Sequence, residues 1–268
     1  MKHKAKKSLG QNFLKSSMIL NKIVDAGEVE KGYIVLEIGP GKGALTEKLL
    51  EKAEKVIAIE KDDGLFSFLS EKFEKEIENR HLILENKDIL GFEPLKHGLD
   101  KTNYKIIANI PYNITGAILK KFLTEENPPK TMVLMVQHEV AKRIIANDNK
   151  ESILSISVKA YGEPKMVTKV GARYFAPPPK VDSAVILIKN ISKKTFTHNK
   201  IEEKKFWELV KTGFAHKRKI LAGNLRELGP EIDWANEIKK INLNEKIRAE
   251  DLSLGSWISL YVNTQNLF

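Results

Sequence analysis

Cysteine is absent from this 268-residue sequence, which excludes disulfides, thiolate metal sites and cysteine nucleophiles. No apolar run approaches the roughly 18 to 20 residues that a membrane-spanning helix needs. The first residues, Met-Lys-His-Lys-Ala-Lys-Lys, are not followed by the apolar stretch of a secretory signal. The six histidines are scattered and show no metal-ligand spacing. These absences predict a cytoplasmic protein with no metal and no membrane partner.

Positive charge is concentrated at the two ends of the chain. The formal net charge is +10, and residues 1–7 alone carry four lysines. Residues 191–268 carry 14 Lys or Arg against 10 Asp or Glu. Two basic ends around a nearly neutral body suit a polyanion such as nucleic acid, although ordinary solvated lysines would give the same composition.

Short apolar segments rich in β-branched residues alternate with amphipathic segments between residues 33 and 189. The expected strands are Ile34–Ile38, Val56–Ile59, Leu82–Leu84, Lys105–Ala108, Thr131–Gln137, Lys165–Val170 and Ala184–Ile188. The expected helices are Ala44–Ala53, Leu65–Phe73, Thr115–Leu123, Val140–Ile145 and Ile153–Tyr161. This alternation predicts an α/β fold with a mostly parallel sheet that is covered by helices on both faces.

The pattern changes after Lys189. Residues 190–200 are polar and are expected to form a linker. Apolar residues then recur at helical spacing from Phe206 to Leu228, until Gly229-Pro230 stops the run, and two shorter helical patterns follow. The sequence therefore predicts an α/β domain over residues 1–190 and a small all-helical domain over residues 195–268.

A glycine-rich turn, Glu37-Ile38-Gly39-Pro40-Gly41-Lys42-Gly43, directly follows the first expected strand. Glycines there let the backbone turn sharply and pass close to a ligand. Glu60 ends the second strand, where a carboxylate can accept hydrogen bonds from both hydroxyls of a ribose. Asp88 follows the third strand, in a place suited to an adenine edge. These strand ends predict a site for an adenosine-containing cofactor.

This pattern leaves the identity of the cofactor open. Gly39, Gly41 and Ala44 also satisfy the dinucleotide pattern G-x-G-x-x-G/A, and nicotinamide enzymes hold ribose with a similar acidic residue. A P-loop is disfavoured because Lys42 is followed by Gly43 and not by Ser or Thr. A glycine turn with a purely structural role is a further alternative.

The segment Asn109-Ile110-Pro111-Tyr112 follows the fourth expected strand and favours methyl transfer. The N6 lone pair of adenine is delocalised into the ring, so this amine is a poor nucleophile. The Asn109 oxygen and a backbone carbonyl can accept its two N–H groups, which orients the nitrogen and favours the positive charge that develops there. Pro111 fixes the turn, and the Tyr112 ring can stack on a flipped base without any role for its hydroxyl. S-adenosylmethionine already carries an activated methyl group, so such a site needs neither a metal nor a strong base.

Taken together, these motifs resemble those of the KsgA-type ribosomal RNA adenine N6-dimethyltransferases, a family related to the Erm methyltransferases. The resemblance covers nearly the whole chain. It also includes residues 9–14 (Leu-Gly-Gln-Asn-Phe-Leu), residues 175–183 (Phe-Ala-Pro-Pro-Pro-Lys-Val-Asp-Ser) and Gly213–Leu225. The chain departs from the family pattern at His138, in Asn149–Ser155 and at Ala176.

The resemblance implies a Rossmann-like S-adenosylmethionine-dependent methyltransferase sheet and a C-terminal helical domain that docks RNA. The implied reaction is dimethylation of two adjacent adenines near the 3′ end of small-subunit (16S) ribosomal RNA, a step in ribosome biogenesis. The implied partner is this RNA within a 30S-type particle, on which the protein acts as a monomer.

The resemblance also implies roles for individual residues. Those that would bind the cofactor are Gln11, Asn12, Leu14, Gly39, Gly41, Glu60, Asp88 and Asn109. Those that would act on the target base are Asn109, Tyr112 and Phe175, with Phe175 as a second aromatic wall opposite Tyr112. The clustered charges of Lys217, Arg218 and Lys219 predict contacts with the RNA backbone.

Two other classes of protein stay open. A nicotinamide-dependent oxidoreductase could use the same glycine turn, although no constellation for hydride transfer follows it. A non-catalytic ribosome-assembly factor could keep the fold without the activity, although the intact Asn109 and Tyr112 argue against it.

Overall fold

The computed structural model describes residues 11–100, 104–146 and 148–268. The four lysines of residues 1–7, which form one of the two basic ends expected to suit a nucleic acid, therefore lie outside the described residues. The chain divides into two compact units, Met1–Ala141 with Gly162–Ile191 and Lys142–Tyr161 with Ser192–Phe268.

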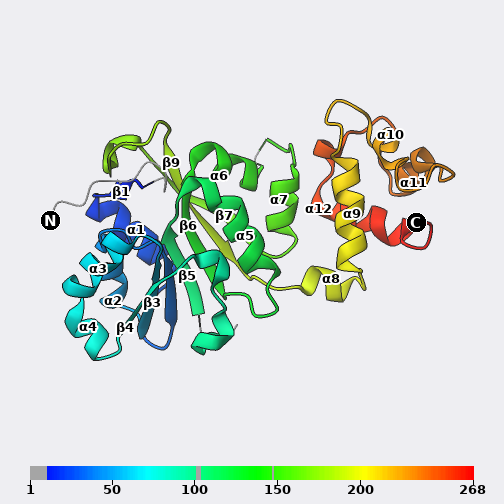
Figure 1. The fold of residues 1–268 in the computed structure, drawn as a ribbon. Helices are drawn as coiled ribbons and strands as arrows, with labels where there is room; N and C mark the ends of the chain where they lie inside the picture. Colours follow the sequence, from blue (N-terminus) through cyan, green and yellow to red (C-terminus); the bar gives the residue numbers. More distant parts are fainter. Residues whose placement is uncertain (1–10, 101–103, 147) are drawn as a thin grey trace. The chain divides into compact units, whose positions relative to one another are not determined.

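The first unit is built on a seven-stranded sheet with the order β4-β3-β2-β5-β6-β9-β7 (Figure 1). Its strands are β2 (Ile34–Ile38), β3 (Lys55–Glu60), β4 (Leu82–Asn86), β5 (Tyr104–Asn109), β6 (Thr131–Gln137), β7 (Glu163–Val170) and β9 (Ser183–Lys189). The five strands from β4 to β6 are parallel, and β9 runs antiparallel to both β6 and β7. All seven predicted strands are confirmed. The buried central strands β2, β3, β5 and β6 read as nearly continuous apolar runs, whereas the edge strand β7 is only partly buried.

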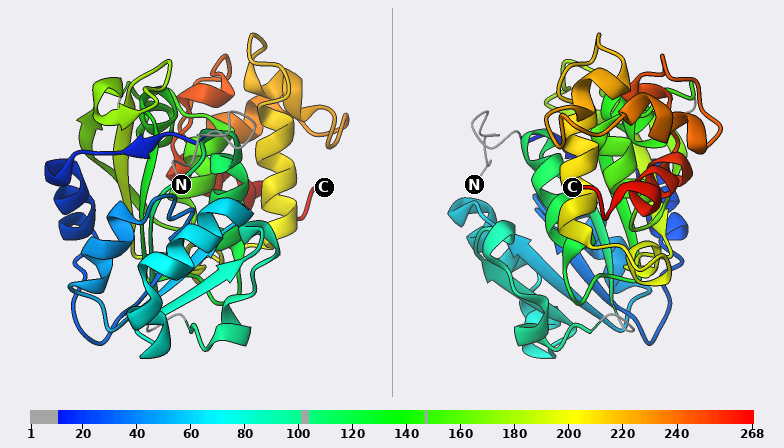
Figure 2. Two further views of the ribbon diagram at one scale, coloured as in Figure 1. Left: turned by 60° about the vertical axis from the view of Figure 1, so that its left-hand side comes forward. Right: turned by 90° about the vertical axis from the view of Figure 1, so that its right-hand side faces the viewer.

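Helices cover both faces of this sheet (Figure 2). On one face α1 (Ser17–Ala26), α2 (Ala44–Leu50) and α3 (Asp63–Lys72) share a core cluster with strand residues such as Val35 and Ile107. On the other face lies α5 (Thr115–Thr124). The shorter helices are α4 (Glu74–Glu78), η2 (Ile89–Gly91), η3 (Pro94–His97), η4 (Tyr112–Ile114) and η5 (Ala172–Tyr174), and α6 (His138–Ile145) follows β6. Helix α1 was not predicted, although its buried residues Ile19, Leu20, Ile23 and Val24 have helical spacing.

A two-stranded ribbon joins the beginning of the described chain to a distant segment. Strands β1 (Phe13–Leu14) and β8 (Phe175–Ala176) pair antiparallel, with Leu14 opposite Phe175. The Lys15 N–H also donates to the Tyr174 carbonyl at 2.9 Å. This pairing holds two of the predicted site segments together.

Helices, joined by turns and loops, are the only regular secondary structure in the described residues of the second unit. Its helices are α7 (Ile153–Lys159), α8 (Lys194–His198), α9 (Glu203–Gly213), α10 (Leu221–Leu225), α11 (Trp234–Lys240), η6 (Ala249–Asp251) and α12 (Leu254–Thr264). The buried Phe206 ring lies 5.6 Å from Phe196, 5.2 Å from Trp207 and 5.9 Å from Tyr261, measured between centroids. No helix in the described part of the chain is long and apolar enough to cross a membrane.

Two details of this unit differ from the sequence-based expectation. Residues 190–200 were expected to be a linker, but they contain α8, which the buried Phe196 anchors. The helical run expected from Phe206 to Leu228 is interrupted, because α9 ends at Gly213 and α10 begins at Leu221. A Cβ at Gly213 would lie 2.4 Å from the Trp257 ring, so the close approach of this ring to the backbone requires glycine.

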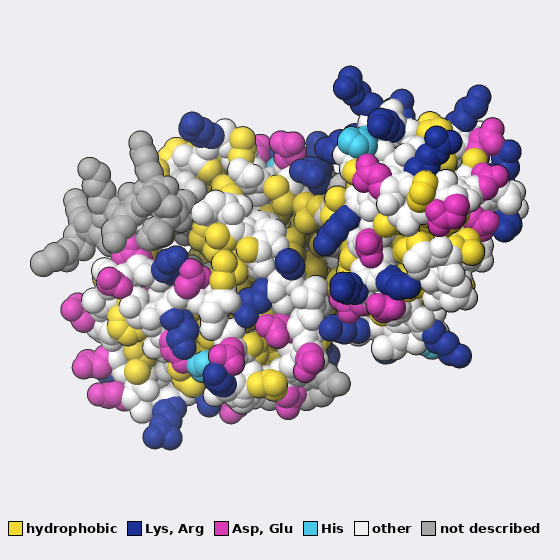
Figure 3. All heavy atoms as spheres, turned by 45° about the vertical axis from the view of Figure 1, so that its right-hand side comes forward, with side chains coloured by type: hydrophobic (Ala, Val, Ile, Leu, Met, Phe, Trp, Pro, Cys, Tyr) yellow, Lys and Arg dark blue, Asp and Glu magenta, His cyan; other side chains and the backbone are white. Residues whose placement is uncertain are grey.

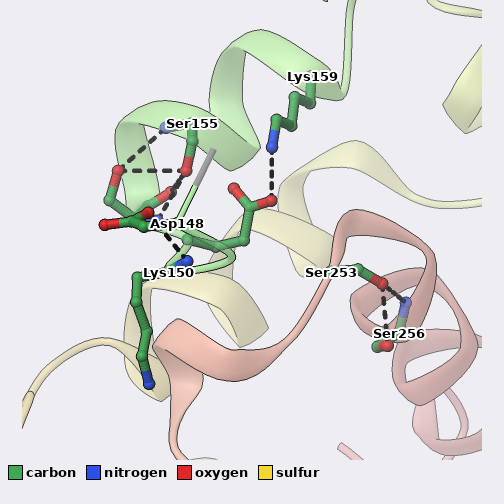
Figure 4. A network of polar contacts seen from close by, with 8 residues as sticks. Asp148, Lys150, Ser155, Lys159, Ser253 and Ser256 are labelled. Atoms are coloured by element: carbon green, nitrogen blue, oxygen red, sulfur yellow. Dashed lines mark hydrogen bonds and ion pairs between the residues drawn. The ribbon is translucent and has the colours of Figure 1, made fainter. Parts of the chain in front are cut away.

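The division of the chain also differs from the predicted boundary at residue 190. Residues 142–161 were expected in the α/β domain, yet they group with the helical unit. The Glu151 N–H donates to the Glu250 carbonyl at 2.7 Å, and Lys150 forms an ion pair with Asp251. Figure 4 shows this region, with Ser155, whose N–H donates to the hydroxyl of the N-cap residue Ser152 at the start of α7, and the Ser253–Ser256 pair at the start of α12. Local sequence patterns do not reveal contacts between segments this far apart.

Candidate functional site

A cavity of about 270 Å³ opens at the carboxyl ends of β2, β3 and β5. The strand order reverses between β2 and β5, and the connections that diverge there leave a crevice at this edge of a parallel sheet. All the residues predicted to bind the cofactor line it: Gln11, Asn12, Leu14, Gly39, Gly41, Glu60, Asp88 and Asn109. The structure thus brings together residues from the N-terminal segment and from four strand ends.

The glycine-rich turn forms one wall of the cavity. Gly39 and Gly41 have φ angles of +66° and +62°, in the left-handed region that favours glycine. A Cβ at Gly41 would also lie 3.1 Å from the Phe13 ring. The Phe13 ring therefore packs against Gly41, whereas a Cβ at Gly39 would meet nothing nearer than Pro111 at 3.9 Å, so the backbone at Gly39 is open to close approach by a ligand.

Glu60 ties the end of β3 to this turn. Its Oε2 accepts the Gly41 N–H at 3.1 Å, and its Oε1 accepts the Asp62 N–H at 2.9 Å. The side chain is only 6% exposed, and this burial raises the pKa of the carboxyl. Each carboxylate oxygen has two lone pairs, so both can accept a further hydrogen bond from a ligand.

The N-terminal segment is fastened to the cavity through two side-chain amides. Gln11 Nε2 donates to Asp62 Oδ2 at 3.2 Å, and Asp62 Oδ1 accepts the Leu65 N–H at 3.0 Å as the N-cap of α3. Asn109 Nδ2 donates to the Asn12 carbonyl at 3.2 Å. This second bond uses the amide nitrogen of Asn109, so its side-chain oxygen is the atom that can accept an amine N–H.

Glu37 also lines the candidate site, although in the sequence it marks only the start of the glycine motif. Its side chain lines the cavity and is 1% exposed. Burial raises the pKa of Glu37 to about 8; the neighbouring Thr46 side chain acts to lower this pKa and the charge of Glu60 to raise it, and burial dominates. Its Oε2 has no hydrogen-bond partner within the described residues. A buried oxygen without a partner is unfavourable, which makes Glu37 a candidate to bind a polar group of the ligand.

Asp88 carries an ion pair that the sequence did not indicate. Its Oδ2 lies 2.8 Å from Lys61 Nζ, and its Oδ1 accepts the Leu90 N–H at 2.9 Å. The Lys61 ammonium is the main cause of the lowered pKa of Asp88. Asp88 is therefore held ionised at the cavity, with Lys61 competing for its Oδ2.

The two predicted aromatic residues differ in their placement. Tyr112 lines the cavity, and its hydroxyl lies 2.5 Å from the hydroxyl of Ser183, which is fully buried. Phe175 is 2% exposed, packs in the core cluster with Leu14, and is not among the residues that line the cavity. Phe175 therefore packs in the core of this structure, and its expected role as a second wall opposite Tyr112 stays a prediction.

The predicted RNA-contacting residues lie in the second unit. Lys217, Arg218 and Lys219 are exposed in the connection between α9 and α10, where the Lys219 N–H donates to the His216 carbonyl at 3.0 Å. Lys and Arg side chains stand out from the surface of this unit in Figure 3. Because the helix is interrupted there, three consecutive charges face solvent instead of following one helix face.

Comparison with known proteins finds similarity over the whole chain. The family model for ribosomal RNA adenine dimethylase matches residues 2–266. A Dehalococcoides mccartyi protein named ribosomal RNA small subunit methyltransferase A is 41% identical over 260 residues, which cover 96% of this chain and 87% of that protein. A Fusobacterium nucleatum protein of the same name is 39% identical, with 97% of each chain covered.

Two solved structures have the same fold. The crystal structure of a dimethyladenosine transferase from Plasmodium falciparum matches with a TM-score of 0.79 and 27% identity, covering 95% of this chain and 98% of that one. The crystal structure of the 23S rRNA methyltransferase ErmE matches with a TM-score of 0.77 and 24% identity, covering 95% and 100%. The predicted Rossmann-like methyltransferase sheet with a helical C-terminal region is confirmed.

Proposed function

Because the chain belongs to the ribosomal RNA adenine dimethylase family, we propose that it dimethylates the N6 amines of two adjacent adenines near the 3′ end of small-subunit (16S) ribosomal RNA. One observation carries the proposal. The eight residues expected to bind S-adenosylmethionine line a single cavity together with Tyr112, the residue expected to stack on the target base.

The residues of this cavity fit S-adenosylmethionine. Glu60 would accept hydrogen bonds from the ribose hydroxyls, and Asp88 would bind the adenine amine. The open backbone at Gly39 leaves room for the ligand, and the unpartnered Glu37 Oε2 can accept a hydrogen bond from one of its polar groups. The cofactor supplies an electrophilic methyl group on its sulfonium.

The target adenine would be held by the Asn109 segment. The Asn109 oxygen would accept an N6–H and stabilise the positive charge that develops on the nitrogen. The Tyr112 ring would stack on the base once it is flipped out of the RNA. Phe175 could reach the base only if its ring left the core cluster, so we assign the stacking role to Tyr112 alone.

We assign RNA docking to the second unit. Lys217, Arg218 and Lys219 would contact phosphates, helped by the N-terminal lysines, while the protein acts as a cytoplasmic monomer on a 30S-type particle. Phosphate contacts of this kind contribute affinity and position the RNA, whereas the choice of base lies in the cavity.

The test is incubation of the protein with under-methylated small subunits and methyl-labelled S-adenosylmethionine, followed by nucleoside analysis of the 16S RNA. Labelled N6,N6-dimethyladenosine is the expected product, and fully methylated subunits are the matched control. Cofactor binding without any product would indicate a non-catalytic assembly factor. Binding of labelled nicotinamide dinucleotide in place of S-adenosylmethionine would indicate an oxidoreductase.

A further inference from the structure

The Tyr112 side chain is fixed at both ends. At its backbone, Tyr112 begins η4 directly after Pro111, and Thr115 Oγ1 donates to the Tyr112 carbonyl at 3.1 Å. At its far end, the phenol oxygen lies 2.5 Å from Ser183 Oγ. Burial raises the pKa of the Tyr112 phenol, so it stays protonated and able to donate at neutral pH.

Ser183 lies at the start of a strand inside the sheet and not in a loop. It is the first residue of β9, with Gln137 of β6 opposite it on one side and Val170 of β7 on the other. Its side chain is 0% exposed, so its hydroxyl is shielded from water, and such a buried hydroxyl needs a partner in the protein. Tyr112 is that partner, so its hydroxyl makes a contact in the structure although no role for this hydroxyl is expected from the sequence.

The residue before Ser183 is held from three directions. The Asp182 carbonyl accepts the His138 N–H at 2.9 Å. Its carboxylate accepts the Ala172 N–H at 3.1 Å and forms an ion pair with Lys169 at 2.8 Å. The backbone that presents the Ser183 hydroxyl is therefore rigid, as an anchor for a neighbouring side chain must be.

We propose that Ser183 is a positioning residue, whose hydroxyl holds the phenol of Tyr112 and so sets the tilt of the ring against the target adenine. This inference rests on the proposed function, in which that ring stacks on the base. A ring held only at its Cβ must lose torsional freedom when the base arrives, whereas a ring already held at its hydroxyl is preorganised. Ser183 then acts on the rate of methyl transfer and leaves cofactor binding unchanged.

The experiment is a double-mutant cycle with Ser183→Ala and Tyr112→Phe, each of which removes the same hydrogen bond from one side. Single-turnover methylation of under-methylated small subunits is measured at saturating S-adenosylmethionine. Each single variant should be slower by about 5- to 10-fold, the equivalent of one neutral hydrogen bond. The double variant should be no slower than either single variant, because only one interaction is lost.

A matched control separates positioning from general stability. Ser155→Ala also removes a fully buried serine hydroxyl, which accepts the Ser152 N–H in the capping box of α7 in the second unit, and it should keep the wild-type rate. Calorimetry should show the same S-adenosylmethionine affinity in all variants. If Ser183→Ala does not fold, Tyr112→Phe still tests the bond, because it leaves the buried serine in place.

The outcomes are distinct. A wild-type rate in Ser183→Ala, or additive losses in the double variant, would overturn the inference while the proposed function stands. Failure of the wild-type protein to methylate any particle would contradict the proposed function itself. In that event, 13Cζ-tyrosine NMR still tests the contact: the Tyr112 signal should shift in Ser183→Ala, and an unshifted signal would overturn the inference independently.

Discussion

Replacement of Glu60 by glutamine should weaken both cofactor binding and the glycine turn. The structure gives Glu60 two tasks, since its carboxylate accepts N–H groups from Gly41 and Asp62 and still lines the cavity. Glutamine keeps the shape of the side chain, but its amide has one acceptor oxygen where the carboxylate has two. One backbone N–H therefore loses its partner, and the ribose loses a charged acceptor.

The size of each effect follows from these bonds. A buried N–H without a partner should lower the free energy of unfolding by about 1–3 kcal/mol. A lost charge-assisted hydrogen bond of about 1.5–3 kcal/mol should raise the Kd for S-adenosylmethionine by about 10- to 150-fold. Because burial raises the pKa of Glu60, the wild-type affinity should also fall as the pH drops through that raised pKa, and Glu60→Gln should lack this dependence.

The measurements are titration calorimetry with S-adenosylmethionine between pH 5 and 8 and urea unfolding of the same samples. Glu93→Gln is the control, since this glutamate is exposed in the same unit and should change neither quantity. An unchanged Kd in Glu60→Gln would refute the assignment of the ribose site. An unchanged stability would show that its backbone hydrogen bonds contribute nothing to the turn.

Three further changes have defined outcomes. Asn109→Ala should slow single-turnover methylation by about 100-fold or more while RNA binding survives, and a near-wild-type rate would mean that the site is misplaced. Replacing Lys217, Arg218 and Lys219 by Gln should flatten the salt dependence of RNA binding with no change in cofactor affinity, and an unaltered slope would leave these charges as solvated surface. Glu37 is protonated in the folded protein up to a pKa of about 8 and ionises near 4.5 when unfolded, so stability should fall as pH rises between these values. In the wild type this fall in the free energy of unfolding should be at most about 5 kcal/mol, and it should be absent in Glu37→Gln. If Glu37→Gln kept the wild-type pH profile of urea unfolding, the burial argument would be contradicted.

Much of the site could be predicted because of a general property of parallel sheets. The apolar runs ending at Ile38, Glu60 and Asn109 are strands by their composition alone, and the carboxyl ends of parallel strands meet at one edge. Polar residues placed directly after such runs must therefore lie close together. The glycine turn, Glu60 and the Asn109 segment can therefore be placed together without any knowledge of tertiary contacts.

The sequence by itself determined which segments form the sheet and which polar residues end its strands, since both depend on neighbours along the chain. Only the tertiary structure decided what each side chain contacts. It paired Lys61 with Asp88, buried the Glu37 Oε2 without a hydrogen-bond partner among the described residues, paired Phe175 with Leu14 of β1 and bonded Tyr112 to Ser183. These outcomes depend on which distant segments become neighbours, and a hydroxyl or a carboxylate carries no local signal of the group that it will meet.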